Sequence, residues 1–329
     1  MNKAKLKDIL RIQTYSYNQW RMFAYIVREC KAKGYDIFVW DGNIYVTKGD
    51  ASKYPCIVAH MDSVHEIRED LHPLEINGNI TGFNRVTMKQ SGIGGDDKVG
   101  VFIALECLDK FDNAKAVFFR DEEVGCVGSE DAYMDFFEDC KFVLQCDRKG
   151  NSDFIVNASG TELSSKEFRN AIKPIISSYG YSFANGMMTD VMTLKDNGLK
   201  VSCANISCGY YNPHTDNEFV NVDDVENCLN LVFSLFKDIK DEYPHTRTIT
   251  PKTSYKYPYA AKKFINSYGW GGYEDYSDFH DPLKTETRED EIIGKKHCVD
   301  CWNITDNLSK DGYCNACYNW HSGKHEVWF

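Results

Sequence analysis

The stretch PCIVAH, residues 55–60, most restricts the fold of this chain, because it is apolar without interruption until its final histidine. A strand with one solvated face alternates apolar and polar residues, whereas a strand buried on both faces is a continuous apolar run. Such a strand needs helices above and below it. The stretch therefore indicates a sheet, at least partly parallel, that is covered on both sides.

Strand and helix patterns alternate along the rest of the chain. Strands are predicted at 115–121, 141–147, 153–158, near 182 and at 200–206, and helices at 1–33, 92–110, 128–138, 164–180 and 222–239. The Asp41-Gly42 pair predicts a hairpin turn between two short strands. This order favours an α/β fold, a three-layer α/β/α sandwich with a mostly parallel mixed sheet.

Composition divides the chain into three parts. Residues 1–244 carry the regular alternation and are expected to form one domain. Residues 245–292 are rich in tyrosine and glycine without a clear period, so we interpret them as a linker or a strap lying on that domain. Residues 293–329 contain paired cysteines and are expected to form a small separate module.

The C-terminal module carries four of the thirteen cysteines. Cys298, Cys301, Cys314 and Cys317 form two Cys-x2-Cys pairs separated by twelve residues, a spacing typical of a zinc ribbon. Their thiolates would hold one structural zinc ion, which a module too small to build a core requires. The alternatives are unrelated thiols or a redox-active pair, but no thioredoxin-like unit surrounds either pair.

Composition also excludes several classes of function. The net charge of -11 and the lack of a basic stripe disfavour nucleic acid as a direct substrate. No window approaches about 18 consecutive apolar residues, and the N-terminal residues are charged throughout, so neither a membrane span nor a signal peptide is expected. Without a secretory signal, the cysteine content favours a reducing compartment, and we expect a cytoplasmic protein.

Histidines and carboxylates gather at the ends of predicted strands and in the turns that follow them. They are His60, Asp62, Asp96, Glu122, Glu123, Asp147 and His214. In open α/β sheets, ligands bind beyond the carboxyl ends of the strands. Two histidines with several carboxylates suit zinc, manganese or cobalt, and the set is too large for one ion. The residues therefore indicate a site for two divalent ions, with one carboxylate left to accept a proton from water.

Five motifs around these residues, AHMDS, GGDDKVG, RDEEVG, CDRKG and PHTDNE, occur in the order known from the co-catalytic zinc exopeptidases. The chain resembles this family, which includes peptidase T, acetylornithine deacetylase and the bacterial zinc aminopeptidases, over roughly residues 5–243. The resemblance implies a metallopeptidase-like hydrolase that cleaves a peptide or amide bond near a chain terminus.

Within the family, an aminopeptidase or a di- or tripeptidase is favoured over an N-acyl amino acid deacetylase, because single-domain relatives lean that way. The expected substrate is accordingly a peptide, or an N-acyl amino acid in the second case. An inactive peptidase-like binding module, docked to a protein partner through its zinc ribbon, is the alternative from another class. The presence of Glu122 argues against that alternative, since a binding module has no need of an unligated base.

The resemblance also implies a role for each site residue. It assigns His60 and Asp147 to one ion, Glu123 and His214 to the other, and Asp96 to a bridge between them. Asp62 would orient the His60 imidazole, and Glu122 would be the general base that activates the water and then protonates the leaving nitrogen. The two active-site ions are expected to be zinc, with cobalt or manganese as alternatives.

Further residues are expected near the substrate. The stretch MMTDVMTL, residues 187–194, resembles a loop that borders the substrate pocket in the family, so Asp190 is expected either to recognise a substrate amine or to brace a ligand. The large lid of peptidase T has no room between Asp147 and His214. Because that lid carries a histidine that stabilises the oxyanion, a replacement donor is needed, and Tyr210 or Tyr211 is our candidate.

Several neighbours of the motifs have no motif support of their own. His65, Glu66 and His72 are therefore assigned surface roles. Cys126 and Cys146 are expected to be small buried residues.

Overall fold

The computed structural model describes residues 1–68 and 70–247, so the predicted zinc ribbon and nearly all of the predicted strap lie outside the described residues. The strands of the main sheet are β1 (Asp36–Trp40), β2 (Asn43–Lys48), β3 (Tyr54–His60), β7 (Ala114–Phe119), β8 (Cys140–Arg148), β9 (Asp153–Ala158), β10 (Thr161–Glu162), β11 (Ser182–Gly186) and β12 (Cys203–Ser207). The helices are α1 (Lys3–Arg11), α2 (Trp20–Ala32), α3 (Gly95–Lys110), α4 (Val127–Glu130), the 3-10 helix η1 (Met134–Phe137), α5 (Lys166–Ser178), α6 (Asp190–Asp196) and α7 (Val222–Asp238).

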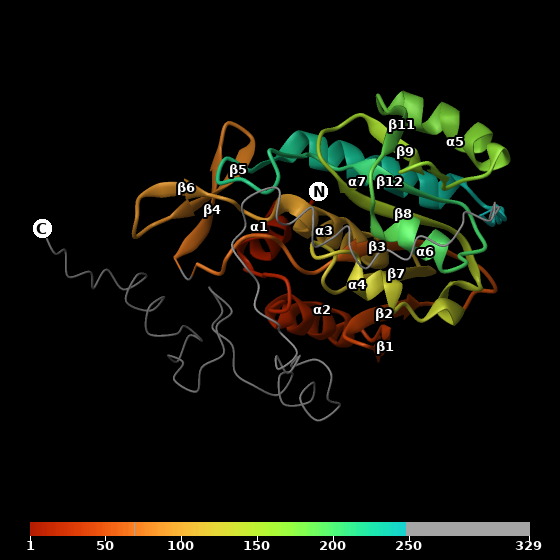
Figure 1. Ribbon diagram of the computed structural model, residues 1–329, viewed down its shortest axis with the longest axis horizontal. Helices are drawn as coiled ribbons and strands as arrows, with labels where there is room; N and C mark the ends of the chain where they lie inside the picture. The colour runs from red at the N-terminus through yellow and green to blue at the C-terminus, as the bar shows by residue number, and fades with distance from the viewer. Residues whose placement is uncertain (69, 248–329) are drawn as a thin grey trace, which may run out of the picture.

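A nine-stranded mixed sheet runs through the described part of the chain (Figure 1). Its order is β1-β2-β7-β3-β8-β12-β9-β10, and β11 pairs with β9. The central neighbours β7, β3, β8 and β12 are parallel, as are β9 and β11, while the remaining pairs are antiparallel. The predicted α/β class with a mixed sheet is confirmed.

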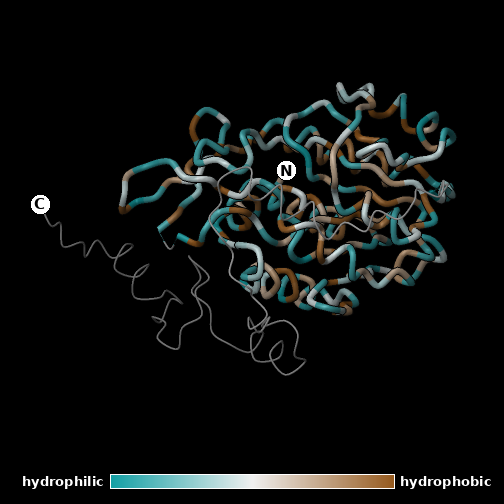
Figure 2. The backbone as a smooth tube through the Cα atoms, in the orientation of Figure 1, coloured by the Kyte–Doolittle hydropathy of each residue, from teal (hydrophilic) through white to brown (hydrophobic). Residues whose placement is uncertain are grey.

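The strand that contains PCIVAH is buried along its whole length, as its sequence predicts. Ile57 and Ala59 join an apolar cluster formed with α1, α2, α3, α5 and α7. Cys56 and Val58 point to the opposite face, where they join a smaller cluster that includes residues of α6 and η1. Apolar residues accordingly follow the central strands and the helix faces that pack on them (Figure 2).

A second sheet stands beside the main one and was not predicted. Its strands are β4 (Leu71–Ile76), β5 (Asn79–Asn84), β6 (Lys89–Ser91), β13 (Tyr210–Tyr211) and β14 (Phe219–Asn221). Their order is β13-β14-β5-β4, and β6 also pairs with β5. Asn77 and Gly78 both have positive φ and close the β4–β5 hairpin, a turn that an Asn-Gly pair favours. This sheet joins the segment before Asp96 to the segment that carries His214.

The N-terminal region forms two helices, and the single helical stretch predicted over 1–33 is wrong in its middle. Between α1 and α2 the chain makes an isolated bridge from Tyr15 to Asn18. Polar side chains in this break are buried, Ser16 and Gln19 among them, because they hydrogen bond to carboxylates in the core. None of the helices formed by the described residues is both long enough and apolar enough to span a membrane.

Candidate active site

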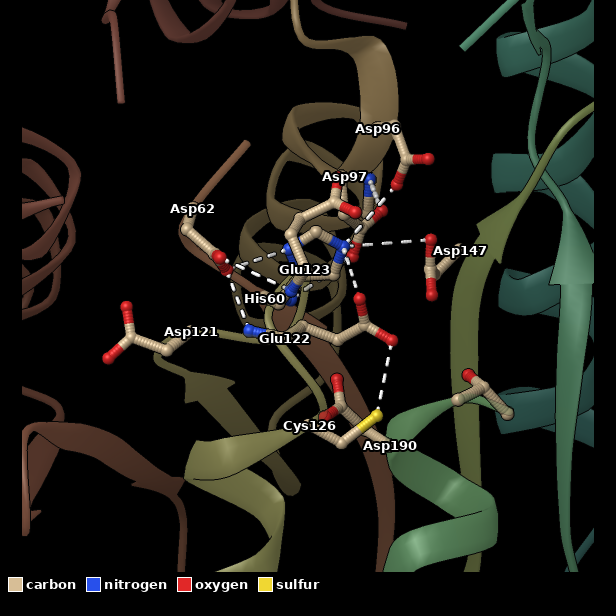
Figure 3. Close-up of polar contacts among 12 residues, drawn as sticks. His60, Asp62, Asp96, Asp97, Asp121, Glu122, Glu123, Cys126, Asp147 and Asp190 are labelled. Atoms are coloured by element: carbon tan, nitrogen blue, oxygen red, sulfur yellow. Dashed lines mark hydrogen bonds and ion pairs between the residues drawn. The ribbon is translucent and has the colours of Figure 1, made fainter. Parts of the chain in front are cut away.

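Most of the predicted site residues in the described region lie close together beyond the carboxyl ends of the central strands, and Figure 3 labels His60, Asp62, Asp96, Glu122, Glu123, Asp147 and Asp190. His60 ends β3, Glu122 and Glu123 follow β7, and Asp147 lies near the end of β8. These strands are parallel neighbours, so their carboxyl ends face the same side. The remaining residues come from outside the sheet: Asp96 from the first turn of α3, and His214 from the loop between β13 and β14.

The converging side chains form two groups that share Asp96. In the first group, His60 Nε2 lies 3.3 Å from Asp96 Oδ1 and 3.7 Å from Asp147 Oδ1. In the second, His214 Nε2 lies 3.3 Å from Asp96 Oδ2 and 3.2 Å from Glu123 Oε2. Within each group the potential ligand atoms all lie within 4.8 Å of one another. Asp96 thus offers one oxygen to each group, which is the arrangement that a bridging carboxylate needs.

The chemistry of these atoms suits cations. His60 Nε2 and Glu123 Oε1 are buried and have no hydrogen-bond partner among the described residues. Burial and repulsion from Asp96 raise the pKa of Glu123 to about 7, and the same two causes raise the pKa of Asp147 well above its ordinary value. Bound cations reverse this effect, because they favour the charged form of each carboxylate. The residues present therefore fit two divalent ions.

Asp62 holds three parts of the site together. Its fully buried carboxylate accepts from His60 Nδ1 at 3.2 Å and from Ser16 Oγ at 2.8 Å. It also accepts from the backbone N–H groups of Glu122 and Glu123, at 2.9 and 3.3 Å. Burial alone would raise the pKa of Asp62, but the hydrogen bonds from His60 and Ser16 hold it below its ordinary value. Since a carboxylate only accepts, His60 Nδ1 carries the proton and Nε2 faces the other carboxylates.

Glu122 lies beside the two groups and belongs to neither. Its Oε2 is 3.9 Å from His60 Nε2, and its Oε1 accepts a hydrogen bond from Cys126 Sγ at 3.3 Å. Burial and the charges of Asp147 and Asp190 raise the pKa of Glu122 well above its ordinary value. Cys126 is buried, as expected, but it also contacts the carboxylate expected to act as the base.

Asp190 is fully buried behind the site. Its Oδ1 accepts from Ser129 Oγ at 2.6 Å, and its Oδ2 accepts from Gln145 Nε2 at 3.0 Å. Gln145 Nε2 also lies 3.2 Å from Asp147 Oδ2. Of the two roles expected for Asp190, these contacts are those of a brace, which acts on Asp147 through Gln145.

The two tyrosines proposed as oxyanion donors lie in different surroundings. The Tyr210 hydroxyl donates to Asp147 Oδ1 at 3.2 Å, so it lies at the site. The Tyr211 hydroxyl donates to Asp224 Oδ2 at 2.7 Å, and Asp224 is in the first turn of α7. The hydroxyl of Tyr211 therefore faces helix α7.

Several residues that contact the site residues were not predicted, and Gln145 and Ser129 are two of them. Ser16 donates to Asp62, and Glu218 accepts from the backbone of Asp96. The surface role expected for His65 is wrong, because His65 Nε2 lies 2.9 Å from the buried carboxylate of Glu218. The position of Glu218 in the PHTDNE motif, four residues after His214, is the one signal that could have drawn attention to it.

Comparisons with known proteins agree with this geometry. Residues 85–231 match the sequence model of the M42 glutamyl aminopeptidase family. Aminopeptidase PepT from Bacillus cereus shares the fold with a TM-score of 0.60 at 13% identity, over 72% of this chain and 97% of that one. An aminopeptidase from the archaeon Desulfurococcus kamchatkensis gives 0.59 at 14% identity, over 74% and 97%. A tripeptidase from Staphylococcus aureus gives 0.56 at 13%, over 71% and 96%.

No curated protein matches this sequence significantly. The match over residues 85–231 and the shared fold nevertheless agree with the co-catalytic zinc exopeptidase class of metallopeptidases. Within that class, the segment matched by the M42 model includes Asp96, the Glu122–Glu123 pair, Asp147 and His214, and it begins after His60. The class predicted from the five motifs is confirmed.

Proposed function

We propose that this metallopeptidase is an aminopeptidase or a di- or tripeptidase that cleaves next to a chain terminus. The observation that carries the proposal is the pair of liganding groups sharing Asp96, with the unligated carboxylate of Glu122 beside them. A hydrolase with one metal ion needs only three protein ligands, and the second group of three potential ligands therefore favours a second ion. The M42 match and the fold shared with aminopeptidases and a tripeptidase support the same class of substrate.

His60 and Asp147 would hold one divalent ion, Glu123 and His214 the other, and Asp96 would bridge them. When bound, the ions would polarise the scissile carbonyl and lower the pKa of the attacking water towards about 7. Zinc suits this donor set, and cobalt or manganese would also fit.

Glu122 would take the proton of the attacking water and then pass it to the leaving nitrogen. Its position suits this role, because its carboxylate lies 3.9 Å from His60 Nε2 and belongs to neither group of proposed ligands. Cys126 and the backbone contact to Asp62 fix its position. Tyr210, whose hydroxyl lies at Asp147, is the better placed of the two oxyanion donors that we considered.

The test is a panel of aminoacyl, dipeptide, tripeptide and N-acyl amino acid substrates, assayed with added zinc, cobalt or manganese. Wild-type protein should hydrolyse the aminoacyl or short peptide substrates, and Glu122→Gln should lower kcat at least about 100-fold while both ions stay bound. Cleavage confined to N-acyl amino acids would instead identify a deacetylase. A wild-type protein that binds peptide without turnover would be the inactive binding module.

We infer that the tail adds a structural ion. Metal analysis should find about three zinc ions per chain, two in the active site and one in a ribbon formed by the four tail cysteines. The double variant Cys298→Ser, Cys301→Ser should bind one ion fewer and keep the peptidase activity. A protein partner for the ribbon, and a reducing compartment such as the cytoplasm, complete the proposal; the nine free cysteines of the described region suit such a compartment.

A further inference from the structure

Glu218 is a buried carboxylate to which the proposed mechanism gives no role. Its side chain has no exposed surface, and a charge in such a place must be hydrogen bonded to be tolerated. Its Oε2 accepts from the backbone N–H of Gly94 at 2.7 Å and from His65 Nε2 at 2.9 Å, and its Oε1 accepts from the backbone N–H of Asp96 at 3.2 Å. One of its three donors is therefore the main chain of the residue that bridges the two liganding groups.

Glu218 also belongs to the loop that carries His214. It lies four residues further along, and its own N–H donates to the carbonyl of Thr215 at 3.1 Å, which closes the turn. Asp96 and His214 are members of the same liganding group but come from segments far apart in sequence. Glu218 is covalently part of one segment and hydrogen bonded to the other, so it links the two segments directly.

His65 brings a third segment to this contact, the one that begins at His60. Its ring lies so close to Gly92 that a Cβ on the glycine would overlap the ring. The ring is thus held between the turn before α3 and the carboxylate of Glu218. Since the carboxylate only accepts, His65 Nε2 donates the hydrogen bond.

We propose that Glu218, with His65, is a positioning residue for the two-ion centre, and that it fixes Asp96 relative to His214 without ligating an ion. The proposal rests on the proposed function of the site. Partners that lie behind metal ligands typically change metal affinity 10- to 100-fold when they are replaced. The ion held between Glu123 and His214 should depend on Glu218 more than the ion held by His60 and Asp147.

Glu218→Gln is the direct test, because glutamine keeps the size of the side chain but offers only one acceptor oxygen. Its amide nitrogen would face either the N–H of Asp96 or the N–H of Gly94, and that donor would lose its partner. Metal-free protein should be titrated with Co²⁺ and followed by absorption and calorimetry, independently of turnover. Thiolate charge-transfer bands identify the ion in the proposed ribbon, which leaves the two active-site binding steps to be compared. We expect the Kd of one active-site step to rise about 10- to 100-fold and that of the other to rise less.

Asp216→Asn is the matched control. Asp216 lies in the same loop and accepts from Ser91 Oγ and the N–H of Gly92, at 3.2 and 3.3 Å, but it does not contact Asp96. This variant should leave both dissociation constants within about threefold of wild type. His65→Ala provides a second route if Glu218→Gln does not fold: it should weaken the same binding step, and His65→Gln, which can still donate to Glu218, should restore it.

Unchanged dissociation constants in Glu218→Gln, or in His65→Ala if the former does not fold, would overturn the proposal. Equal weakening of both ions together with a loss of stability in the metal-free protein would also overturn it, since Glu218 would then be part of the scaffold only. These outcomes differ from failure of the proposed function. A wild-type protein that binds two ions but cleaves no peptide would refute the function, while the binding comparison would still decide the role of Glu218.

Discussion

Replacing Asp62 by asparagine should loosen the two-ion site while the protein remains folded. Oδ1 of Asp62 accepts from His60 Nδ1 and from the N–H of Glu122, at 3.2 and 2.9 Å. Oδ2 accepts from Ser16 Oγ and from the N–H of Glu123, at 2.8 and 3.3 Å. Asparagine has one acceptor oxygen, so its amide nitrogen would face two groups that now donate to the carboxylate.

The nitrogen should turn towards Ser16, because a hydroxyl can rotate and accept whereas a backbone N–H cannot. The N–H of Glu123 then lacks an acceptor, and the bonds from His60 and Glu122 go to a neutral oxygen. An unsatisfied buried donor costs about 1–3 kcal/mol, and bonds to a charged group contribute about 1.5–3 kcal/mol each. We expect the free energy of unfolding to fall by about 2–4 kcal/mol, or Tm by roughly 5–15 °C, and metal affinity to fall about 10- to 100-fold.

Asp121→Asn is the control for this prediction, because Asp121 is equally buried and does not contact His60. It accepts from the N–H of Tyr17 at 2.6 Å and from Gln19 Nε2 at 3.0 Å. Asp121 forms an ion pair with Arg120 and is not one of the proposed ligands, so its neutral replacement should leave metal affinity within about threefold. Urea unfolding of metal-free protein and competition for Zn²⁺ with a chromogenic chelator measure both quantities. Equal metal affinities in Asp62→Asn and wild type would refute the reasoning, as would equal weakening in the control.

Three further predictions follow from the surroundings of the site. Gly92→Ala places a methyl group against the His65 ring and should destabilise the protein by about 1–3 kcal/mol; in a His65→Ala background the cost measured by urea unfolding should nearly vanish. Burial lowers the pKa of Lys98 to about 8, below its value in the unfolded chain, so the unfolded state binds more protons between about pH 8 and 10.5. The free energy of unfolding should therefore rise over that pH range by up to about 3 kcal/mol, and Lys98→Met should abolish this rise. Chelating the ions should lower Tm, and because burial and repulsion disfavour the charged form of Glu123, Glu123→Gln should raise the Tm of the metal-free protein, as calorimetry would show.

The main sheet and the site residues were predictable for the same physical reason. A strand buried on both faces, such as the one ending at His60, has an unmistakable composition, and a polar residue directly after it must lie at the edge of the sheet. The ligand types then indicate the chemistry. The second sheet was missed because β4, β5 and β6 are partly exposed and their apolar and polar residues alternate weakly. The Asn77-Gly78 turn between β4 and β5 was nevertheless a usable signal.

The contacts behind the ligands were not predictable, because they join segments far apart in the chain and use side chains with no local pattern. Ser16 lies in a break that apolar periodicity assigns to a helix, and its value becomes visible only when the break is folded against Asp62. In the sequence, His65 is indistinguishable from a surface residue. Its ring can pack closely in the folded chain because position 92 is a glycine. The role of such residues depends on contacts that form only in the folded chain, and a local sequence pattern carries no information about those contacts.

Asp62 and Glu218 have one feature in common: each is a buried carboxylate that accepts hydrogen bonds from backbone N–H groups of a ligand-bearing segment. Asp62 holds the Glu122–Glu123 backbone in this way, and Glu218 holds the backbone of Gly94 and Asp96. Hydrogen bonds to the backbone leave the ligand side chains free to bind metal ions. They also fix the position of the main chain from which those side chains extend. The site therefore has its negative charge in two layers. The inner layer consists of the carboxylates that would face the cations. The outer layer, Asp62 and Glu218, is hydrogen bonded by the protein itself, so metal-free protein should keep the ligand-bearing segments in place while the inner carboxylates repel one another.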